Sequence, residues 1–260
     1  MPQTYPTILD ADREALTHRP EAGRPVMHHR WQNLLFLHWE VPASSIQRLL
    51  PEGLEVDLFE GRAFVGLVPF TMRGVRPRGL PAVRGLSDFH ETNVRTYVHH
   101  KGQRPGVWFF SLDAANLVVA ALGRQWFGLP YFFARMSLKV EEAAGDLRLS
   151  YASDRLYPDP RPATTRIVAE VGSGVEPARV GTLEYFLAER YLLYSVSRRG
   201  DIATGRVHHT PYPLQAARVV SLEESVLLAA GIDRPDVPPL AHYASGVDVE
   251  VFGLERVRTA

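Results

Sequence analysis

The sequence predicts a single α+β domain in which most strands are antiparallel, and three observations support this fold class. Segments with strand-like composition outnumber helical ones, and glycine-containing turns separate several of them. Strands and helices do not alternate regularly, so a parallel sheet built from βαβ units is not expected. No linker, internal repeat or low-complexity tract divides the chain. We therefore expect a polar N-terminal extension over residues 1–25 and one domain over residues 26–260.

The first half of the domain is expected to contain long strands separated by short helices. The strand segments are rich in β-branched and aromatic residues, whereas the helical segments place apolar residues at helical spacing. Pro42 lies in the first turn of one helix, and Asp113 is expected to cap another. Helices are predicted at 11–17, 42–50 and 114–125, and strands at 29–41, 54–59, 63–73, 89–98 and 106–112.

The second half is expected to continue the sheet with strands that are joined by hairpins. Gly145-Asp146 and Gly200-Asp201 are turn signals of the kind that connect neighbouring antiparallel strands. Strands are predicted at 131–140, 147–153, 165–171, 191–196, 202–208, 215–221 and 245–254, with short helices at 183–188 and 223–230.

The composition excludes several classes of function. The 260 residues carry 29 basic and 29 acidic side chains, and this net charge of zero favours neither nucleic acid nor an anionic membrane surface. The chain has no cysteine, which excludes disulfides and thiolate catalysis. No apolar run is long enough to span a membrane, and residues 1–23 lack the apolar core of a signal peptide. A soluble cytoplasmic protein is the simplest interpretation.

Ten histidines raise the question of a metal site, but their arrangement does not support one. Six of them form the doublets His28-His29, His99-His100 and His208-His209. Adjacent side chains on a strand point to opposite faces, so a doublet cannot supply two ligands to one ion. His-Glu-x-x-His, Gly-x-Ser-x-Gly, phosphate-loop and dinucleotide motifs are all absent from the sequence. We therefore predict no metal ion and no cofactor.

One predicted strand carries a row of polar side chains. Glu91, Asn93, Arg95 and Tyr97 share one face of the segment 89–98, because side chains on a strand alternate with a period of two. Successive members of the row are about 7 Å apart, so one small molecule can reach several of them. Such a row either lines a polar cavity or forms the solvated face of a surface strand.

The segment that follows contains a series of short motifs. Leu112-Asp113 precede the predicted helix, Gly123-Arg124-Gln125 lie at its end, and Pro130 comes next, while Leu49–Asp57 forms another motif nearer the N-terminus. This series resembles the acetoacetate decarboxylase superfamily, in which an aspartate precedes a helix that is followed by Gly-Arg-Glu and then by Pro-Lys-Lys. The resemblance implies a cone-shaped β-barrel with a few flanking helices. It also aligns Glu91 with the family's active-site glutamate and Gln32 with its substrate-binding arginine.

Five further motifs are distributed along the chain. They are Phe36-Leu-His-Trp39, the motif around Glu91, Gly106-Val-Trp-Phe-Phe-Ser-Leu-Asp113, Leu129-Pro-Tyr131 and His242-Tyr-x-Ser-Gly-Val-Asp248. These motifs resemble an uncharacterised branch of the same superfamily, the YqjF-like or DUF2071 family, and the resemblance extends over about residues 28–253.

The sequence departs from the decarboxylases at the residues that carry their chemistry. Tyr131 and Phe132 stand where the family has two lysines, one of which condenses with the substrate ketone. A phenol cannot form an imine. The only lysines in the chain, Lys101 and Lys139, are expected at exposed positions. The resemblance therefore implies a related pocket without Schiff-base decarboxylation.

Three interpretations of this pocket remain open. In the first, Glu91 is a general acid or base, Tyr131 an acid or oxyanion donor, and Arg95 a carboxylate ligand, in lyase- or isomerase-like chemistry on a small oxo-acid. In the second, the pocket binds an oxo-acid or aromatic acid without catalysis. In the third, the polar row is solvated and the conspicuous surface is an interface of a homo-oligomer. Further ligand contacts are predicted from Gln32, Asn93, Tyr97, Trp108, Asp113 and Phe132.

Overall fold

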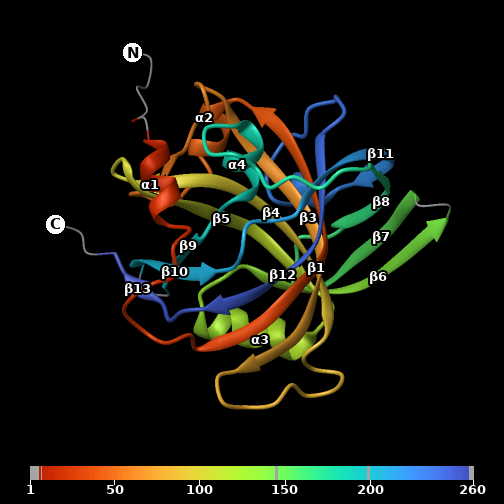
Figure 1. Ribbon diagram of the computed structural model, residues 1–260, viewed down its shortest axis with the longest axis horizontal. Coiled ribbons are helices and arrows are strands. Elements are labelled where there is room, and N and C mark those ends of the chain that lie inside the picture. Colours follow the sequence, from red (N-terminus) through yellow and green to blue (C-terminus); the bar gives the residue numbers. More distant parts are fainter. Residues whose placement is uncertain (1–5, 7, 144–145, 198–199, 258–260) are drawn as a thin grey trace.

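A single curled sheet dominates the computed structural model, which describes residues 6, 8–143, 146–197 and 200–257 (Figure 1). Within these residues thirteen strands are hydrogen-bonded into the sheet. They are β1 (Met27–Val41), β2 (Glu55–Val56), β3 (Ala63–Pro77), β4 (Phe89–His100), β5 (Gln103–Ala114), β6 (Tyr131–Ala143), β7 (Asp146–Tyr157), β8 (Thr164–Val171), β9 (Leu192–Val196), β10 (Ile202–His208), β11 (Leu214–Glu224), β12 (Leu240–Val251) and β13 (Glu255–Arg256).

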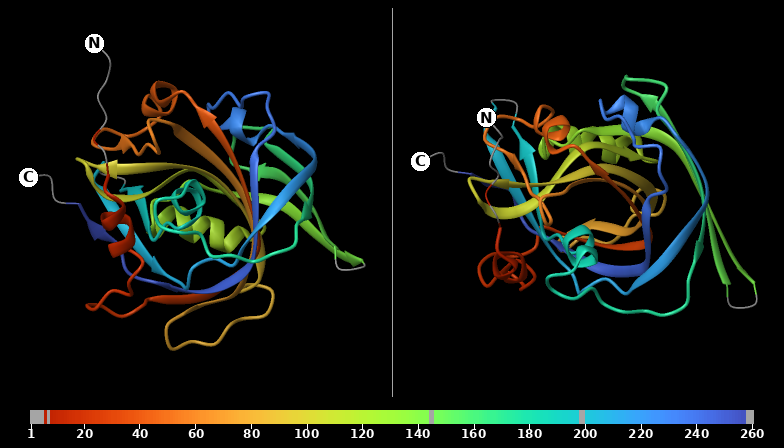
Figure 2. Two further views of the ribbon diagram at one scale, coloured as in Figure 1. Left: turned by 45° about the horizontal axis from the view of Figure 1, so that its top comes forward. Right: turned by 90° about the horizontal axis from the view of Figure 1, so that it is seen from above.

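The strand order explains the curled shape. Neighbouring strands follow the order β13-β10-β9-β5-β6-β7-β8-β11-β12-β1-β3-β4-β2. Two further pairings, β10 with β12 and β5 with β4, join strands that lie far apart in this order, so the sheet closes round part of a ring (Figure 2). Only the pairs β5–β6 and β5–β9 are parallel among the described strands, which confirms the predicted, mostly antiparallel fold class.

Five short helices accompany the sheet in the described part of the chain. They are α1 (Asp10–Ala15), α2 (Ala43–Gln47), α3 (Leu117–Trp126), α4 (Leu183–Ala188) and α5 (Val226–Ala229). Figure 1 shows α3 near one end of the molecule and α4 near the other. Among the described residues, no helix combines the length and the apolar character that crossing a membrane requires. Gly145 of the first predicted hairpin turn lies outside the described residues, whereas β6 and β7 on either side of it pair antiparallel.

Strand β4 passes through the interior of the sheet between β3 and β5. Its antiparallel register places Glu91 opposite Phe70 of β3 and opposite Ala114 of β5. Every residue of β4 except His90 is buried, because the curled sheet and its helices cover both faces of the strand. The predicted polar row is therefore inside the protein, and the alternative of a solvated surface face is wrong.

The helix predicted at 114–125 begins later than expected, and Asp113 is not its cap. Helix α3 begins at Leu117, and the Asn116 side chain caps it by accepting hydrogen bonds from the backbone N–H groups of Val118 and Val119, both at 3.1 Å. Asp113 still belongs to β5. Pairing with β4 and β6 keeps the chain extended through Ala114, so a helix cannot begin there.

Helix α4 covers the end of the polar row. The carbonyl oxygen of Leu187 accepts a hydrogen bond from Tyr97 Oη at 2.6 Å and another from Arg95 Nη2 at 2.8 Å. The ring of Phe186 lies 5.0 Å from the ring of Tyr97, centre to centre. The helix therefore holds two members of the row, Arg95 and Tyr97, in place through one carbonyl oxygen.

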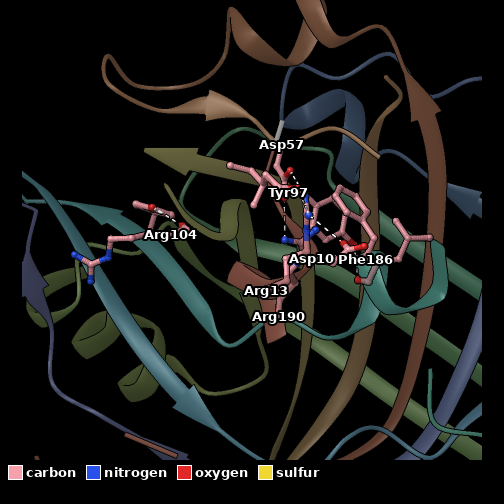
Figure 3. Close-up of polar contacts among 10 residues, drawn as sticks. Asp10, Arg13, Asp57, Tyr97, Arg104, Phe186 and Arg190 are labelled. Carbon is pink, nitrogen blue, oxygen red and sulfur yellow. Dashed lines mark hydrogen bonds and ion pairs between the residues drawn. The ribbon is translucent and has the colours of Figure 1, made fainter. Parts of the chain in front are cut away.

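A buried ion network lies beside α4 (Figure 3). Asp57 forms ion pairs with Arg13 of α1 at 2.5 Å and with Arg190 at 2.9 Å, and all three side chains are almost fully buried. The Arg190 guanidinium also lies over the rings of Tyr97 and Phe186, at 4.8 and 4.2 Å from their centres. Helix α1 lies within the predicted polar extension over residues 1–25, and the network ties it to the body of the protein.

Replacement of Asp57 tests how much this network contributes to the stability of the fold. The variant Asp57→Ala leaves two buried guanidinium groups without their shared counter-charge, so we expect it to lower the free energy of unfolding by about 3–5 kcal/mol. Urea unfolding followed by circular dichroism measures the change. The matched control is Asp248→Ala, because the Asp248 carboxylate is 80% exposed where it pairs with Arg30 and its loss should cost less than about 1 kcal/mol. Similar small changes in both variants would contradict the expectation.

Candidate functional site

An internal cavity of about 330 Å³ runs along the polar row of β4. Three members of the row, Glu91, Asn93 and Arg95, line this cavity from one face of the strand, as their alternation in the sequence predicted. Tyr131 and Arg190 add two further polar side chains. Most of the remaining wall is apolar, with Leu34, Val68, Phe70, Phe109 and Leu112 among its side chains.

Glu91 and Tyr131 form a hydrogen-bonded pair that two separate strands bring together. Tyr131 is the first residue of β6, which pairs in parallel with β5, while Glu91 lies on the neighbouring β4. The Tyr131 hydroxyl donates a hydrogen bond to Glu91 Oε2 at 3.2 Å. An acid and a phenol therefore meet in the cavity although 40 residues separate them in the sequence.

Helix α3 contacts Tyr131 directly. A Cβ atom at Gly123 would lie only 2.4 Å from Cδ2 of Tyr131, so no larger residue leaves room for the ring. Arg124 Nη1 donates a hydrogen bond to the backbone carbonyl of Tyr131 at 2.9 Å. Gly123 and Arg124 therefore position Tyr131 at the start of β6.

Burial keeps Glu91 neutral over a wide range of pH. Only 2% of the residue is exposed, and this loss of solvation raises the pKa of its carboxyl group to about 8. The hydrogen bond from Tyr131 opposes this increase, whereas the nearby Asp113 adds to it. Burial also raises the pKa of Tyr131, and the adjacent Glu91 raises it further. The Glu91 carboxyl group is therefore protonated near neutral pH and ionises above about pH 8.

Arg95 is a buried cation without a counter-ion. Its exposed fraction is 7%, and no carboxylate in the described residues forms an ion pair with it. Nη2 is bonded to the Leu187 carbonyl, the guanidinium lies 5.5 Å from the ring centre of Phe36, and Nε has no hydrogen-bond partner in the described structure. Because an unpaired buried charge is costly, this arrangement favours an anionic ligand.

The other predicted contact residues do not line the cavity. Asp113 forms an ion pair with Arg155 at 2.7 Å, and Phe132 packs on that guanidinium at 3.7 Å from its ring centre. The Tyr97 hydroxyl is hydrogen-bonded to the Leu187 carbonyl and to the His38 ring, and Trp108 packs against the cluster that contains Leu192 and Tyr194. Gln32 lies on β1 opposite Gly246, outside the lining. None of these five side chains is therefore placed to contact a ligand in the cavity.

Arg190 is a lining residue that sequence reasoning missed. It follows α4 and reaches the cavity while its Nη1 atom is paired with Asp57. One signal was present in the sequence, since Glu189-Arg190 is a charged pair inside the otherwise apolar segment 185–194. Its partners, Asp57 and Arg13, are distant in the sequence, and only the fold brings them together.

Neither lysine lies near the cavity. Lys101 is exposed in the turn between β4 and β5, and the side chain of Lys139 is 70% exposed and paired with Glu141. In the part of the chain that the structure describes, no three histidine, aspartate or glutamate side chains gather in a way that could hold a metal ion.

Solved structures with this fold include acetoacetate decarboxylase-like enzymes. Acetoacetate decarboxylase from Legionella pneumophila subsp. pneumophila str. Philadelphia 1 matches with a TM-score of 0.61 at 15% identity, over 99% of this chain and 98% of that one. The enduracididine biosynthesis enzyme MppR, complexed with the condensation product of pyruvate and imidazole 4-carboxaldehyde, matches with a TM-score of 0.61 at 13% identity, over 90% of each chain. At such low identities the likeness shows the fold alone.

Sequence similarity identifies the family. The profile of DUF2071, described as an uncharacterized conserved protein, matches residues 28–248. The uncharacterized protein YqjF of Bacillus subtilis (strain 168) is 36% identical over 231 residues, which cover 89% of this chain and 92% of YqjF. The chain therefore belongs to the DUF2071 family, as its motifs indicated.

The raised pKa of Glu91 predicts how stability depends on pH. Between about pH 4.5 and about pH 8 the unfolded chain carries an ionised Glu91 while the folded chain keeps it protonated, so stability falls as the pH rises through this range. Glutamine cannot ionise. Above pH 8 we therefore expect Glu91→Gln to be more stable than wild type by at most about 5 kcal/mol, with a smaller difference at about pH 5. Urea unfolding at several pH values measures this difference.

The exposed Glu142 provides the control for this measurement. Glu142→Gln removes a carboxyl group on the same sheet that stays in water, and its stability should follow the wild-type pH profile. If the profile of Glu91→Gln also runs parallel to that of wild type, Glu91 does not have the raised pKa that its burial implies.

Proposed function

We propose that this protein binds a small oxo-acid in the cavity along β4 and transfers a proton on it with Glu91 and Tyr131. One observation carries the proposal: the buried cation Arg95, which has no carboxylate partner among the described residues, shares a cavity with the Glu91–Tyr131 pair. A ligand carboxylate would supply the missing counter-charge. Because Glu91 is neutral below about pH 8, it would not repel that carboxylate.

The proposed chemistry is a proton transfer beside a carbonyl group. With the ligand carboxylate on Arg95, the ionised form of Glu91 takes a proton from the carbon next to the carbonyl. The electrons of the broken C–H bond form the carbon–carbon double bond of an enolate, and the negative charge moves to the carbonyl oxygen. Tyr131 donates a hydrogen bond to that oxygen. Return of the proton from Glu91 restores the ketone, so the cycle is balanced and consumes no other reactant.

The fold neighbours support an oxo-acid as the ligand, whereas the residues of this chain argue against an imine mechanism. MppR is described with a ligand formed from pyruvate, and acetoacetate decarboxylase acts on an oxo-acid by its name. In this chain Tyr131 stands where the resemblance expects the reactive lysine, and both lysines are exposed. The chemistry proposed for the cavity of this chain therefore does not pass through a Schiff base. One fold supports many such variations.

A second function, ligand binding without catalysis, is favoured by the apolar character of most of the cavity wall. Side chains such as Phe70, Phe109 and Leu112 would hold an aromatic or aliphatic acid by burying it, with Arg95 as its anchor. Both functions require the same anchor, and they differ in whether Glu91 exchanges a proton with the ligand.

Binding of pyruvate tests the anchor that the two functions share. At saturating pyruvate we expect the melting temperature of wild type to rise by a few degrees, since ligand at about 100 times its Kd stabilises a protein by about 2.7 kcal/mol. Arg95→Met removes the guanidinium and should abolish the shift, whereas Arg135→Met, at an exposed position on β6, should preserve it. An equal shift in wild type and Arg95→Met would contradict the role of Arg95.

Hydrogen exchange on the bound ligand distinguishes catalysis from binding. In D₂O we expect wild type to replace the methyl protons of pyruvate by deuterium, at a rate that rises with pH and levels off above about pH 8, where Glu91 is ionised. Glu91→Gln should be slower by at least about 100-fold. Proton NMR of the methyl signal measures both rates. Exchange no faster than in buffer, together with a pyruvate-induced thermal shift, would establish the binding function instead.

A further inference from the structure

The cavity has a polar end and an apolar end. The polar end is formed by Glu91, Asn93 and Arg95, with Arg190 next to helix α4. The other end is lined by apolar side chains of β1, β3, β12 and α3. Among them are Met27, Val75, Pro77, Val118, Leu122 and Trp126.

The register of the sheet gives the direction of the apolar part. Phe70 of β3 is opposite Glu91, whereas Val75 and Pro77 lie five and seven residues further along the same strand, beyond an irregularity in its pairing with β1. Pro77 is opposite Met27 of β1, which is opposite Val251 of β12, so three strands supply apolar lining on this side of Glu91.

The apolar lining continues onto the surface of the protein. Val118, Leu122 and Trp126 of α3 line the cavity and are nevertheless 50%, 37% and 67% exposed. Leu86, in the loop between β3 and β4, also lines the cavity and is 37% exposed. The Asn116 side chain, at the start of α3, donates a hydrogen bond to the Leu86 carbonyl and so fixes the loop to the helix. These residues form the apolar mouth of the cavity, at the end of the molecule that bears α3 in Figure 1.

We infer that the natural ligand is an amphipathic acid, whose carboxylate binds at Arg95 and whose apolar chain extends along β3 toward the apolar mouth. The inference rests on the proposed function and names its substrate class. A three-carbon acid reaches only the polar end of this cavity, whose volume of about 330 Å³ is in the range that drug-sized ligands occupy. An apolar chain would cover the lining beyond Glu91 and the exposed side chains of α3, which otherwise remain in contact with water.

A series of straight-chain 2-oxo acids tests this inference by isothermal titration calorimetry on the full chain. The probes are pyruvate and its homologues with four, six and eight carbons. We expect the affinity to increase with each added methylene, by a factor of up to about four, which is the value for complete burial of a CH₂ group. The titrations are repeated with Arg95→Met, which should weaken binding of every member because they share the carboxylate.

Two variants of α3 test whether the apolar chain of the ligand lies in the apolar mouth. Leu122→Asp places a charge in the apolar mouth and should reduce the ratio of eight-carbon to three-carbon affinity by at least about tenfold, because a buried apolar contact is replaced by a desolvated carboxylate. Leu117→Asp is the matched control, since Leu117 is 55% exposed on the same helix and does not line the cavity, and it should leave the ratio unchanged. The ratio is taken within each variant, so a general loss of stability does not produce the effect.

The outcomes separate this inference from the function on which it rests. If no acid of any length binds, the proposed function fails. If pyruvate binds as tightly as the eight-carbon acid, the function stands and the inference is overturned. A third outcome would also overturn the inference: the affinity does not depend on chain length, and the protein is a dimer that both Leu122→Asp and Leu117→Asp dissociate. The exposed side chains of α3 would then form a contact between two copies of the protein.

Discussion

The burial of one face of β4 is the constraint on which the rest of the site depends. An ordinary surface strand would leave a carboxyl group, an amide and a guanidinium in water, where each would keep its usual pKa and carry no information about function. The curled sheet instead encloses them, and α4 covers the end of the row through the Leu187 carbonyl. Loss of water makes Glu91 a weak acid and leaves Arg95 as a cation that lacks a counter-ion among the described residues.

Among the described residues, Arg95 differs from the other buried arginines near the cavity because no carboxylate forms an ion pair with it. Asp113 is paired with Arg155 behind the cavity wall, and Asp57 is shared between Arg13 and Arg190 beside α4. These ion pairs are buried, so breaking any of them would be costly. Glu91 balances no charge while it is protonated. Arg95 lies at the polar end of a cavity whose other end is apolar, and this arrangement is the basis for proposing an acid with an apolar chain as the ligand.

Tyr131 and Phe132, at the positions where the family resemblance expects lysines, make specific contacts with their surroundings. The glycine at position 123 still leaves space for a large side chain, and Arg124 still holds the backbone of the residue that fills it. The Tyr131 hydroxyl donates a hydrogen bond to Glu91, and a phenol cannot form an imine with a ketone. Phe132 packs on the guanidinium of Arg155, a contact that an ammonium group could not make because like charges repel. Both aromatic side chains therefore have defined partners in the folded protein.

The sequence by itself determined the mostly antiparallel fold class, the shared face of Glu91, Asn93 and Arg95, and the absence of an amine at position 131. These features depend on alternation along one strand and on residue identity, which are local properties. Only the tertiary structure decided that the row is buried, that Asn116 rather than Asp113 caps α3, and that Gln32, Tyr97, Trp108, Asp113 and Phe132 lie outside the cavity. It also brought Arg190 into the lining through Asp57, which is distant in the chain. Burial and partnership arise from contacts between remote segments, so no local pattern could specify them.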